Sequence, residues 1–239
     1  MSGKCKRAAL ALCLAAALCL SGCLGGTGGA GGGGVNRPER VESAELQFTH
    51  PASGDTVAVF DTSMGVFRAV LFPEEAPQAC ANFIGLVQAG YYNGLTVSRV
   101  EAGFVVGAGR DANGGTATIW NGSGYPPEYT DKLHHYSGAL CAAMSERGEG
   151  ASVFYVMQTA PGMEQELLDQ MAAQGWRQEI IDAYAAAGGA PYLDYTDTVF
   201  GQVYEGMETV DAIGAVGVDE NQVPAEPVTI HSVTIETYP

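Results

Sequence analysis

A single arginine stands in a predicted strand of mostly small and apolar residues. The segment TVSRVEAGFVVGAG covers residues 96–109, and Arg99 lies five residues before Phe104. A guanidinium is costly to bury unless a partner neutralises it or it faces an opening. Arg99 is therefore a candidate for a substrate-facing residue, and the alternative is a structural ion pair.

The charge balance argues against one class of partner. The chain has 239 residues, with 11 Lys and Arg against 27 Asp and Glu. Nucleic-acid binders need clustered basic residues that neutralise phosphates, and this sequence has no such cluster. We therefore expect no nucleic-acid partner. The hydrophobic share of 46% is enough for one domain with a sizeable core.

The first residues have the features of an export signal. Basic residues at positions 4–7 precede an apolar run over residues 8–20, which is short for a membrane span. The run ends in LSGC, which resembles the lipobox of bacterial lipoproteins. Residues 1–22 are thus predicted to be a signal peptide, and Cys23 to carry a lipid that holds the protein at the outer face of the cell membrane. The alternative is an ordinary secretory signal cut nearby.

Residues 23–45 are predicted to be a flexible tether. Their glycine-rich segment LGGTGGAGGGG cannot bury enough apolar surface to fold. The folded domain is then predicted over residues 46–239. Cys80 and Cys141 remain in it as the unmodified cysteines, and we expect them to be buried free thiols, because their spacing is weak evidence for a disulfide.

The elements that must position Arg99 are mostly strands. Residues 56–72 alternate between apolar and polar types around a short turn, which predicts a β-hairpin. A helical spacing of apolar residues follows over 74–94, and the chain ends in another alternating segment. Further strands are predicted over residues 95–107, 138–144 and 152–157.

The composition changes between about residues 162 and 190. This part is rich in helix formers, is interrupted at Gly175 and stops at Gly188 and Gly189. Glycine is a frequent helix terminator, so a helical insertion between two strands is predicted.

Four segments resemble the cyclophilin-type peptidyl-prolyl isomerases over roughly residues 56–237, and they follow one another in the same order as in that family. Each alone is weak, but the four in register are specific. The arginine strand described above resembles the strand that presents the family's catalytic arginine. The other three are EEAPQACANFIGLVQAGYYNG, the pair GALCAAMS and GASVFYV, and YLDYTDTVFGQVYEGMETVDAI.

The resemblance implies a mainly β fold, a closed eight-stranded antiparallel β-barrel capped by helices, here with the helical insertion. It implies prolyl cis/trans isomerisation of exported polypeptides that contain X-Pro bonds, by a monomer that needs no cofactor or metal. The barrier to this rotation is about 20 kcal/mol, because the C–N bond has partial double-bond character. A guanidinium that donates to the substrate carbonyl and imide nitrogen would stabilise the twisted state more than the ground state.

Family correspondence also implies the residues of the site. Arg99 would be catalytic, and Phe104 would seat the proline ring. The remaining substrate-binding positions would be Val105, Ala143, Met144, Tyr155, Tyr192, Leu193 and Asp197.

Several of these positions depart from the family pattern. Gly107 and Val153 stand where the family usually has glutamines that help to hold the arginine and the peptide backbone. Other replacements are Ser98 and Asp197 for histidines, Met144 for asparagine and Tyr192 for tryptophan. These departures motivate an alternative, a degenerate cyclophilin that binds proline peptides as a chaperone or adaptor with little turnover. A third interpretation is an envelope-assembly role, with the insertion as the docking surface.

Two polar features have more than one interpretation. Asp197 is expected either to face Arg99 across the pocket mouth or to be a solvated turn residue. The adjacent His134 and His135 could suggest a metal, but neighbouring residues of an extended strand point to opposite faces. We therefore predict a solvated pair and no metal site.

Overall fold

The computed structural model describes residues 35–239. The predicted signal peptide, Cys23 and the glycine-rich run lie outside the described residues. Within residues 35–239, no helix is long and apolar enough to cross a membrane.

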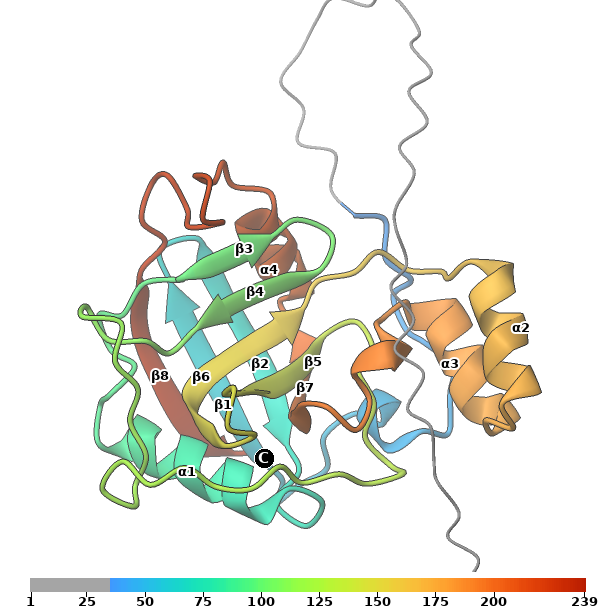
Figure 1. The fold of residues 1–239 in the computed structure, drawn as a ribbon, viewed down its shortest axis with the longest axis horizontal. Helices are drawn as coiled ribbons and strands as arrows, with labels where there is room; N and C mark the ends of the chain where they lie inside the picture. Colours follow the sequence, from blue (N-terminus) through green and yellow to red (C-terminus); the bar gives the residue numbers. More distant parts are fainter. Residues whose placement is uncertain (1–34) are drawn as a thin grey trace, which may run out of the picture. The chain divides into compact units, whose positions relative to one another are not determined.

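One antiparallel sheet contains all eight strands of the described chain, in the order β3-β4-β6-β5-β7-β2-β1-β8 (Figure 1). β1 and β2 form the predicted hairpin, and β8 is the predicted C-terminal strand. The strands are β1 (Thr56–Thr62), β2 (Gly65–Leu71), β3 (Arg99–Glu101), β4 (Val105–Ala108), β5 (Ala139–Met144), β6 (Gly150–Met157), β7 (Thr198–Glu205) and β8 (Ile230–Thr237).

The sheet is a curled half-barrel, so the prediction of a closed barrel is wrong. Its edge strands β3 and β8 do not pair with each other, so the sheet stays open. An isolated bridge from Thr96 to Thr229 joins the segments that precede these two strands. β3 is too short to close the ladder, since it has 3 residues. A loop covers part of its free edge instead, where the Val100 N–H donates to the Gln222 carbonyl at 2.7 Å.

Four α-helices and two short 3-10 helices accompany this sheet within residues 35–239. They are α1 (Pro77–Gln88), α2 (Gln165–Ala173), α3 (Gln178–Ala187), α4 (Met207–Gly214), η1 (Leu46–Phe48) and η2 (Pro191–Leu193). α1 is the predicted helix, and its N-cap Ala76 has no side chain that could bind the first N–H groups. The Glu128 carboxylate accepts these bonds from Gln78 and Ala79, at 3.0 and 2.9 Å.

Apolar residues cover both faces of the sheet. The inner cluster includes Phe60 and Phe67, whose rings stack at 4.4 Å, and Phe83 of α1. The outer cluster includes Val105, Tyr155 and Val199 from three different strands. Because successive strand residues point to opposite faces, six of the strands contribute to both clusters, whereas β3 and β8 contribute to the inner cluster alone. Cys80 and Cys141 are buried and free, as predicted.

The predicted helical insertion is present as the α2–α3 hairpin, beside the sheet in Figure 1. It has a core of its own, in which Ile180, Ile181 and Tyr184 of α3 pack with Leu168 and Met171 of α2. The hairpin also packs on Tyr136, which immediately precedes the strand region of β5. The insertion is therefore anchored by a buried apolar contact rather than only by its two ends.

Residues 35–45, which precede the predicted domain boundary, are already packed against the folded domain. Arg37 donates to both carboxylate oxygens of Asp211, at 2.7 and 2.6 Å. The buried Glu45 carboxylate accepts from the Arg177 guanidinium at 3.1 Å. Residues 35–45 are therefore not a free tether, and the predicted boundary is too late. Composition could not reveal this, because the ion pair joins residues far apart in the sequence.

Candidate active site

Three neighbouring strands place Arg99, Gly107 and Tyr155 in one row. Arg99 of β3 pairs with Gly107 of β4, which pairs with Tyr155 of β6 (Figure 1). Residues directly opposite one another share a face of the sheet, and adjacent strands lie about 4.8 Å apart. The Arg99 and Tyr155 backbones are thus about 10 Å apart, two strand spacings, on the outer face. Gly107 adds no side chain between them.

Phe104 is held by the turn that joins β3 and β4. Its N–H donates to the Glu101 carbonyl at 2.9 Å, and its carbonyl accepts from the Gln158 N–H at 2.7 Å. Gly103 makes the turn with a φ of +75°, in the left-handed region that favours glycine. The position of Phe104 is therefore fixed by the backbone on both sides.

Most of the predicted substrate-binding residues meet in the outer cluster. Phe104, Val105, Ala143, Tyr155 and Leu193 all pack within it. Together they form an apolar floor beside Arg99, suited to a proline ring. We call this set the apolar floor.

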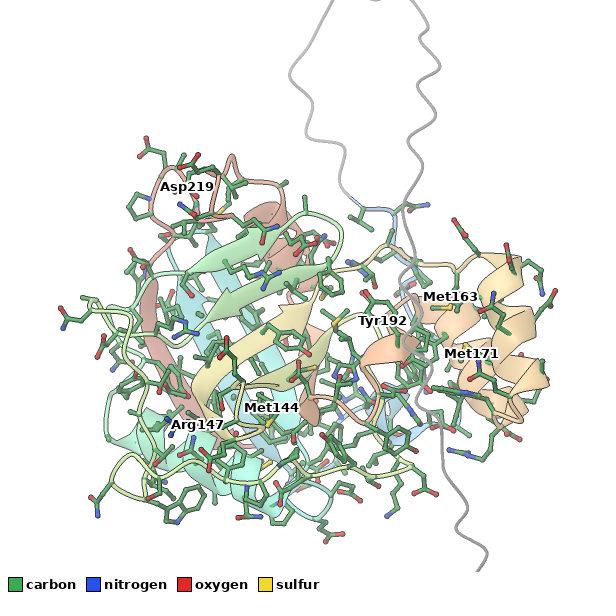
Figure 2. All side chains as sticks on the ribbon, in the orientation of Figure 1. Met144, Arg147, Met163, Met171, Tyr192 and Asp219 are labelled. Atoms are coloured by element: carbon green, nitrogen blue, oxygen red, sulfur yellow. The ribbon has the colours of Figure 1, made fainter. Side chains whose placement is uncertain are left out.

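Two of the predicted substrate-binding residues, Tyr192 and Met144, do not belong to the apolar floor. Tyr192 is 66% exposed, and its ring stacks on Phe104 with centroids 6.4 Å apart. Figure 2 shows Tyr192 on the side of the sheet nearer the α2–α3 hairpin. Met144 is half-buried and packs against the inner cluster, so its side chain supports the sheet from the other side.

Asp197 holds the apolar floor in place. Its carboxylate accepts hydrogen bonds from the Tyr155 hydroxyl at 2.8 Å and the Met144 N–H at 2.9 Å. Burial, together with negative charge nearby, raises the pKa of Tyr155 well above its usual value, so its hydroxyl remains a donor. The interpretation of Asp197 as a solvated turn residue is therefore wrong, and the interpretation that it faces Arg99 across the pocket mouth stays a prediction.

Arg99 is both accessible and paired. Its side chain is 56% exposed, and it donates to the Glu101 carboxylate at 2.8 Å. Both residues lie on the same side of β3, because they are two positions apart. An exposed pair of this kind contributes about 0.2–1 kcal/mol, so its stabilising role is small. The guanidinium has five N–H donors and can therefore donate to a substrate while it remains bound to Glu101.

Comparison with known proteins agrees with this geometry. The family model "Cyclophilin type peptidyl-prolyl cis-trans isomerase/CLD" matches residues 57–235. This match covers most of the chain. The chain belongs to the cyclophilin family of peptidyl-prolyl isomerases.

Bacterial relatives are similar over nearly their whole length. A Staphylococcus aureus protein, provisionally named a peptidyl-prolyl cis-trans isomerase, is 35% identical to this cyclophilin over 77% of its chain and 93% of the relative. A Staphylococcus epidermidis protein with the same name is 34% identical, over 74% and 90% of the two chains.

Solved structures share the fold at lower identity. A cyclophilin-type isomerase of Cryptosporidium parvum has a TM-score of 0.61 and 19% identity, over 77% of this cyclophilin and 99% of that chain. A second crystal structure of that protein, obtained in the presence of the dipeptide Ala-Pro, has a TM-score of 0.60 and 20% identity, over 76% and 99%.

The departure at Gly107 has a clear structural consequence in this cyclophilin. No side chain stands opposite Arg99 on β4, where the family resemblance implies an amide. A Cβ at Gly107 would lie 3.6 Å from the Phe154 carbonyl and 3.7 Å from the Arg99 Cβ, which are ordinary contacts. The backbone would therefore accept a longer side chain, and Glu101 now contacts the guanidinium at this site.

Sequence reasoning missed a buried cluster around Asp194. The carboxylate lies 2.8 and 2.7 Å from the Nδ1 atoms of His134 and His135, and accepts from the Tyr184 hydroxyl at 2.9 Å. The two histidines are 2% and 1% exposed, so the prediction of a solvated pair is wrong. Both imidazole rings point to the Asp194 carboxylate, although adjacent residues of an extended strand were expected to point to opposite faces.

This cluster holds the chain segment next to the site in place. Burial by itself raises the pKa of Asp194, but hydrogen bonds from His134 and His135 outweigh it and lower the pKa overall. Within residues 35–239, no group of three or more His, Cys, Asp or Glu side chains could hold a metal ion. Asp194 immediately follows η2, so its hydrogen bonds fix the turn that carries Tyr192 and Leu193. The sequence signal that could have pointed to this cluster was the pair Leu193-Asp194 in the last of the four cyclophilin-like segments.

Proposed function

We propose that this cyclophilin isomerises X-Pro bonds in exported, unfolded polypeptides at the outer face of the cell membrane, to which a lipid on Cys23 attaches it. The observation that carries the catalytic part is the placement of an accessible Arg99 beside the apolar floor on one face of the sheet. The signal-like segment and the LSGC sequence support the location.

The apolar floor supplies binding energy to the proline ring. Phe104 and Leu193 are half-buried, so each leaves part of its side chain for a ligand to cover. Burial of an apolar ring contributes about 25 cal/mol per Å² of covered surface. With the ring held in this way, the residue before the proline can rotate about the C–N bond.

Arg99 supplies the preference for the twisted state. As the amide resonance is lost, the imide nitrogen regains a lone pair that can accept a hydrogen bond from the guanidinium. A donor placed where this charge develops lowers the barrier without a covalent intermediate. The structure of a cyclophilin of similar fold in the presence of the dipeptide Ala-Pro supports this use of the floor.

A second candidate function is binding of proline peptides with little turnover, as a chaperone or adaptor. Gly107 favours it, because no side chain on β4 helps to orient Arg99. A catalytic group that is loosely held can lose about a hundredfold in rate.

A protease-coupled assay on a short Ala-Pro peptide separates the two functions. Substoichiometric protein should accelerate the slow cis-to-trans phase in proportion to its concentration. A pure binder would change that phase only when its concentration approaches that of the peptide. Saturable peptide binding without any acceleration would reject isomerisation and leave the second function.

A further inference from the structure

A small cavity adjoins the apolar floor on the side of Asp197. It has a volume of about 10 Å³ and is lined by Tyr129, His135, Tyr195 and Asp197, among others. A space of this volume holds one group the size of a water molecule. It borders the proline site at Tyr155, because Asp197 bonds the Tyr155 hydroxyl and the His135 ring stacks on Tyr155 at 6.4 Å.

The buried wall of this cavity offers hydrogen-bond acceptors. The Nδ1 of His135 faces the Asp194 carboxylate, an acceptor, so Nδ1 carries a proton. In the neutral ring, Nε2 is then an acceptor, and this buried atom has no hydrogen-bond partner among residues 35–239. Each oxygen of Asp197 accepts one hydrogen bond and has capacity for another. A cationic donor would match both groups.

Two tyrosines form the solvent side of the cavity. Tyr129 and Tyr195 are 44% and 58% exposed, and their rings meet edge to face at 6.0 Å. Burial, and then the charge of Asp197, raises the pKa of Tyr129. Aromatic faces next to a carboxylate are a favourable environment for a cation.

The backbone of Tyr195 adds a separate observation. Its φ is +64°, in the left-handed region where a bulky residue costs about 1–2 kcal/mol. Because more than half of the side chain is exposed, burial does not offset much of this cost. A glycine would adopt the same conformation without strain. The ring is thus held at the cavity at the expense of stability.

We propose that this cavity is a subsite for the ammonium group of a lysine side chain that lies close to the proline in the substrate polypeptide. The ammonium group is about the size of a water molecule and fits, whereas the larger planar guanidinium of arginine does not. The proposal rests on the proposed function, since it extends the site that binds the proline.

Peptide affinities test the subsite. Short proline peptides would carry lysine, arginine or norleucine at each of the two positions on either side of the proline, with dissociation constants measured by NMR titration. At one position, lysine should bind about tenfold more tightly than norleucine, with arginine between them or weaker. The lysine preference should decrease as salt rises, because the partners are charged. Equal affinities at every position would overturn the proposal and assign the cavity to a structural water only.

Two variants make the test specific. Tyr195→Gly should abolish the lysine preference, retain affinity for the norleucine peptide and raise the thermal midpoint, because it relieves the strained backbone. Tyr129→Phe is the matched control, since it keeps the ring and should keep most of the preference. A Tyr195→Gly protein that is less stable and still prefers lysine would show that Tyr195 is structural and would overturn the proposal.

The same titrations separate this inference from the proposed function. If every peptide is isomerised but all bind alike, isomerisation stands and the lysine subsite fails. If lysine peptides bind preferentially but none is isomerised, the subsite stands and the catalytic function fails.

Discussion

Arg99 and Tyr155 lie on the same face of the sheet with Gly107 between them, so no side chain of β4 separates the guanidinium from the apolar floor. This relationship places an accessible cation next to a seat for an apolar ring. It also leaves Arg99 with an exposed carboxylate, Glu101, as its side-chain partner. The geometry therefore supports catalysis and explains why the rate should be modest.

A glutamine at position 107 should raise the rate. The contacts around a Cβ at this position are ordinary, so Gly107→Gln should fold and place an amide next to Arg99. We expect kcat/KM to increase roughly tenfold, because a better-oriented donor stabilises the twisted state. Gly107→Ala is the matched control and should leave the rate almost unchanged. An equal rise in both variants would point to backbone stiffening instead.

The Asp194 cluster predicts how stability depends on pH. Its folded pKa is lower than the usual 3.8, so its contribution is present above that pH and is lost as the pH falls through the folded pKa. Asp194→Asn should lower the free energy of unfolding by about 3 kcal/mol at neutral pH, because it disrupts a buried hydrogen-bonded charge. The difference from the native protein should narrow below about pH 4 in denaturant titrations.

Tyr184→Phe is the control for this cluster. It removes one donor to Asp194 and keeps the carboxylate, so it should cost about 1 kcal/mol at every pH. A constant difference between Asp194→Asn and the native protein from pH 7 to pH 3 would contradict the assignment.

The insertion should be dispensable for the sheet but not for substrate choice. Replacing residues 163–188 with a short Gly/Ser loop removes Tyr184, which bonds Asp194 next to the turn that carries Leu193. We expect a folded protein with a lower thermal midpoint, since Tyr136 becomes exposed, and an altered preference among proline peptides. Circular dichroism and the isomerase assay would measure both. Loss of the folded sheet would mean that the insertion belongs to the core.

Cys23 should determine where the protein is found. Its position at the end of LSGC predicts that Cys23→Ser is released or left unprocessed, since a serine cannot take the lipid through a thioether. Detergent partitioning of cell fractions gives the measurement. If the variant partitions as the native protein does, the lipid-anchor proposal is wrong.

Local patterns predicted most elements of the fold. Alternation identified the β1–β2 hairpin, helical spacing identified α1, and glycines at 175 and 188 bounded the insertion helices. Closure of the barrel could not be judged in this way, because it depends on the length of β3 and on which segment covers its edge. The packing of residues before position 46 was not predicted for a similar reason, since Arg37 and Asp211 are distant in the sequence.

The packing of the candidate site residues was predicted better than their polar contacts. The resemblance to cyclophilins brought Phe104, Tyr155 and Leu193 together correctly in one cluster. The roles of Asp197 and His135 were missed, because a hydrogen bond to Tyr155 or Asp194 leaves no trace in local composition. Buried polar networks of this kind become visible only when the three-dimensional partners are known.

The most direct test of the account is the turnover of Arg99→Ala on an Ala-Pro peptide, compared with its affinity for the same peptide. We predict a loss of kcat of about a hundredfold or more with little change in affinity, because the guanidinium acts mainly on the transition state. Phe104→Ala should weaken affinity as well, since it removes the seat of the ring. Equal turnover in the native and Arg99→Ala proteins, with the fold intact by circular dichroism, would contradict the catalytic role of Arg99.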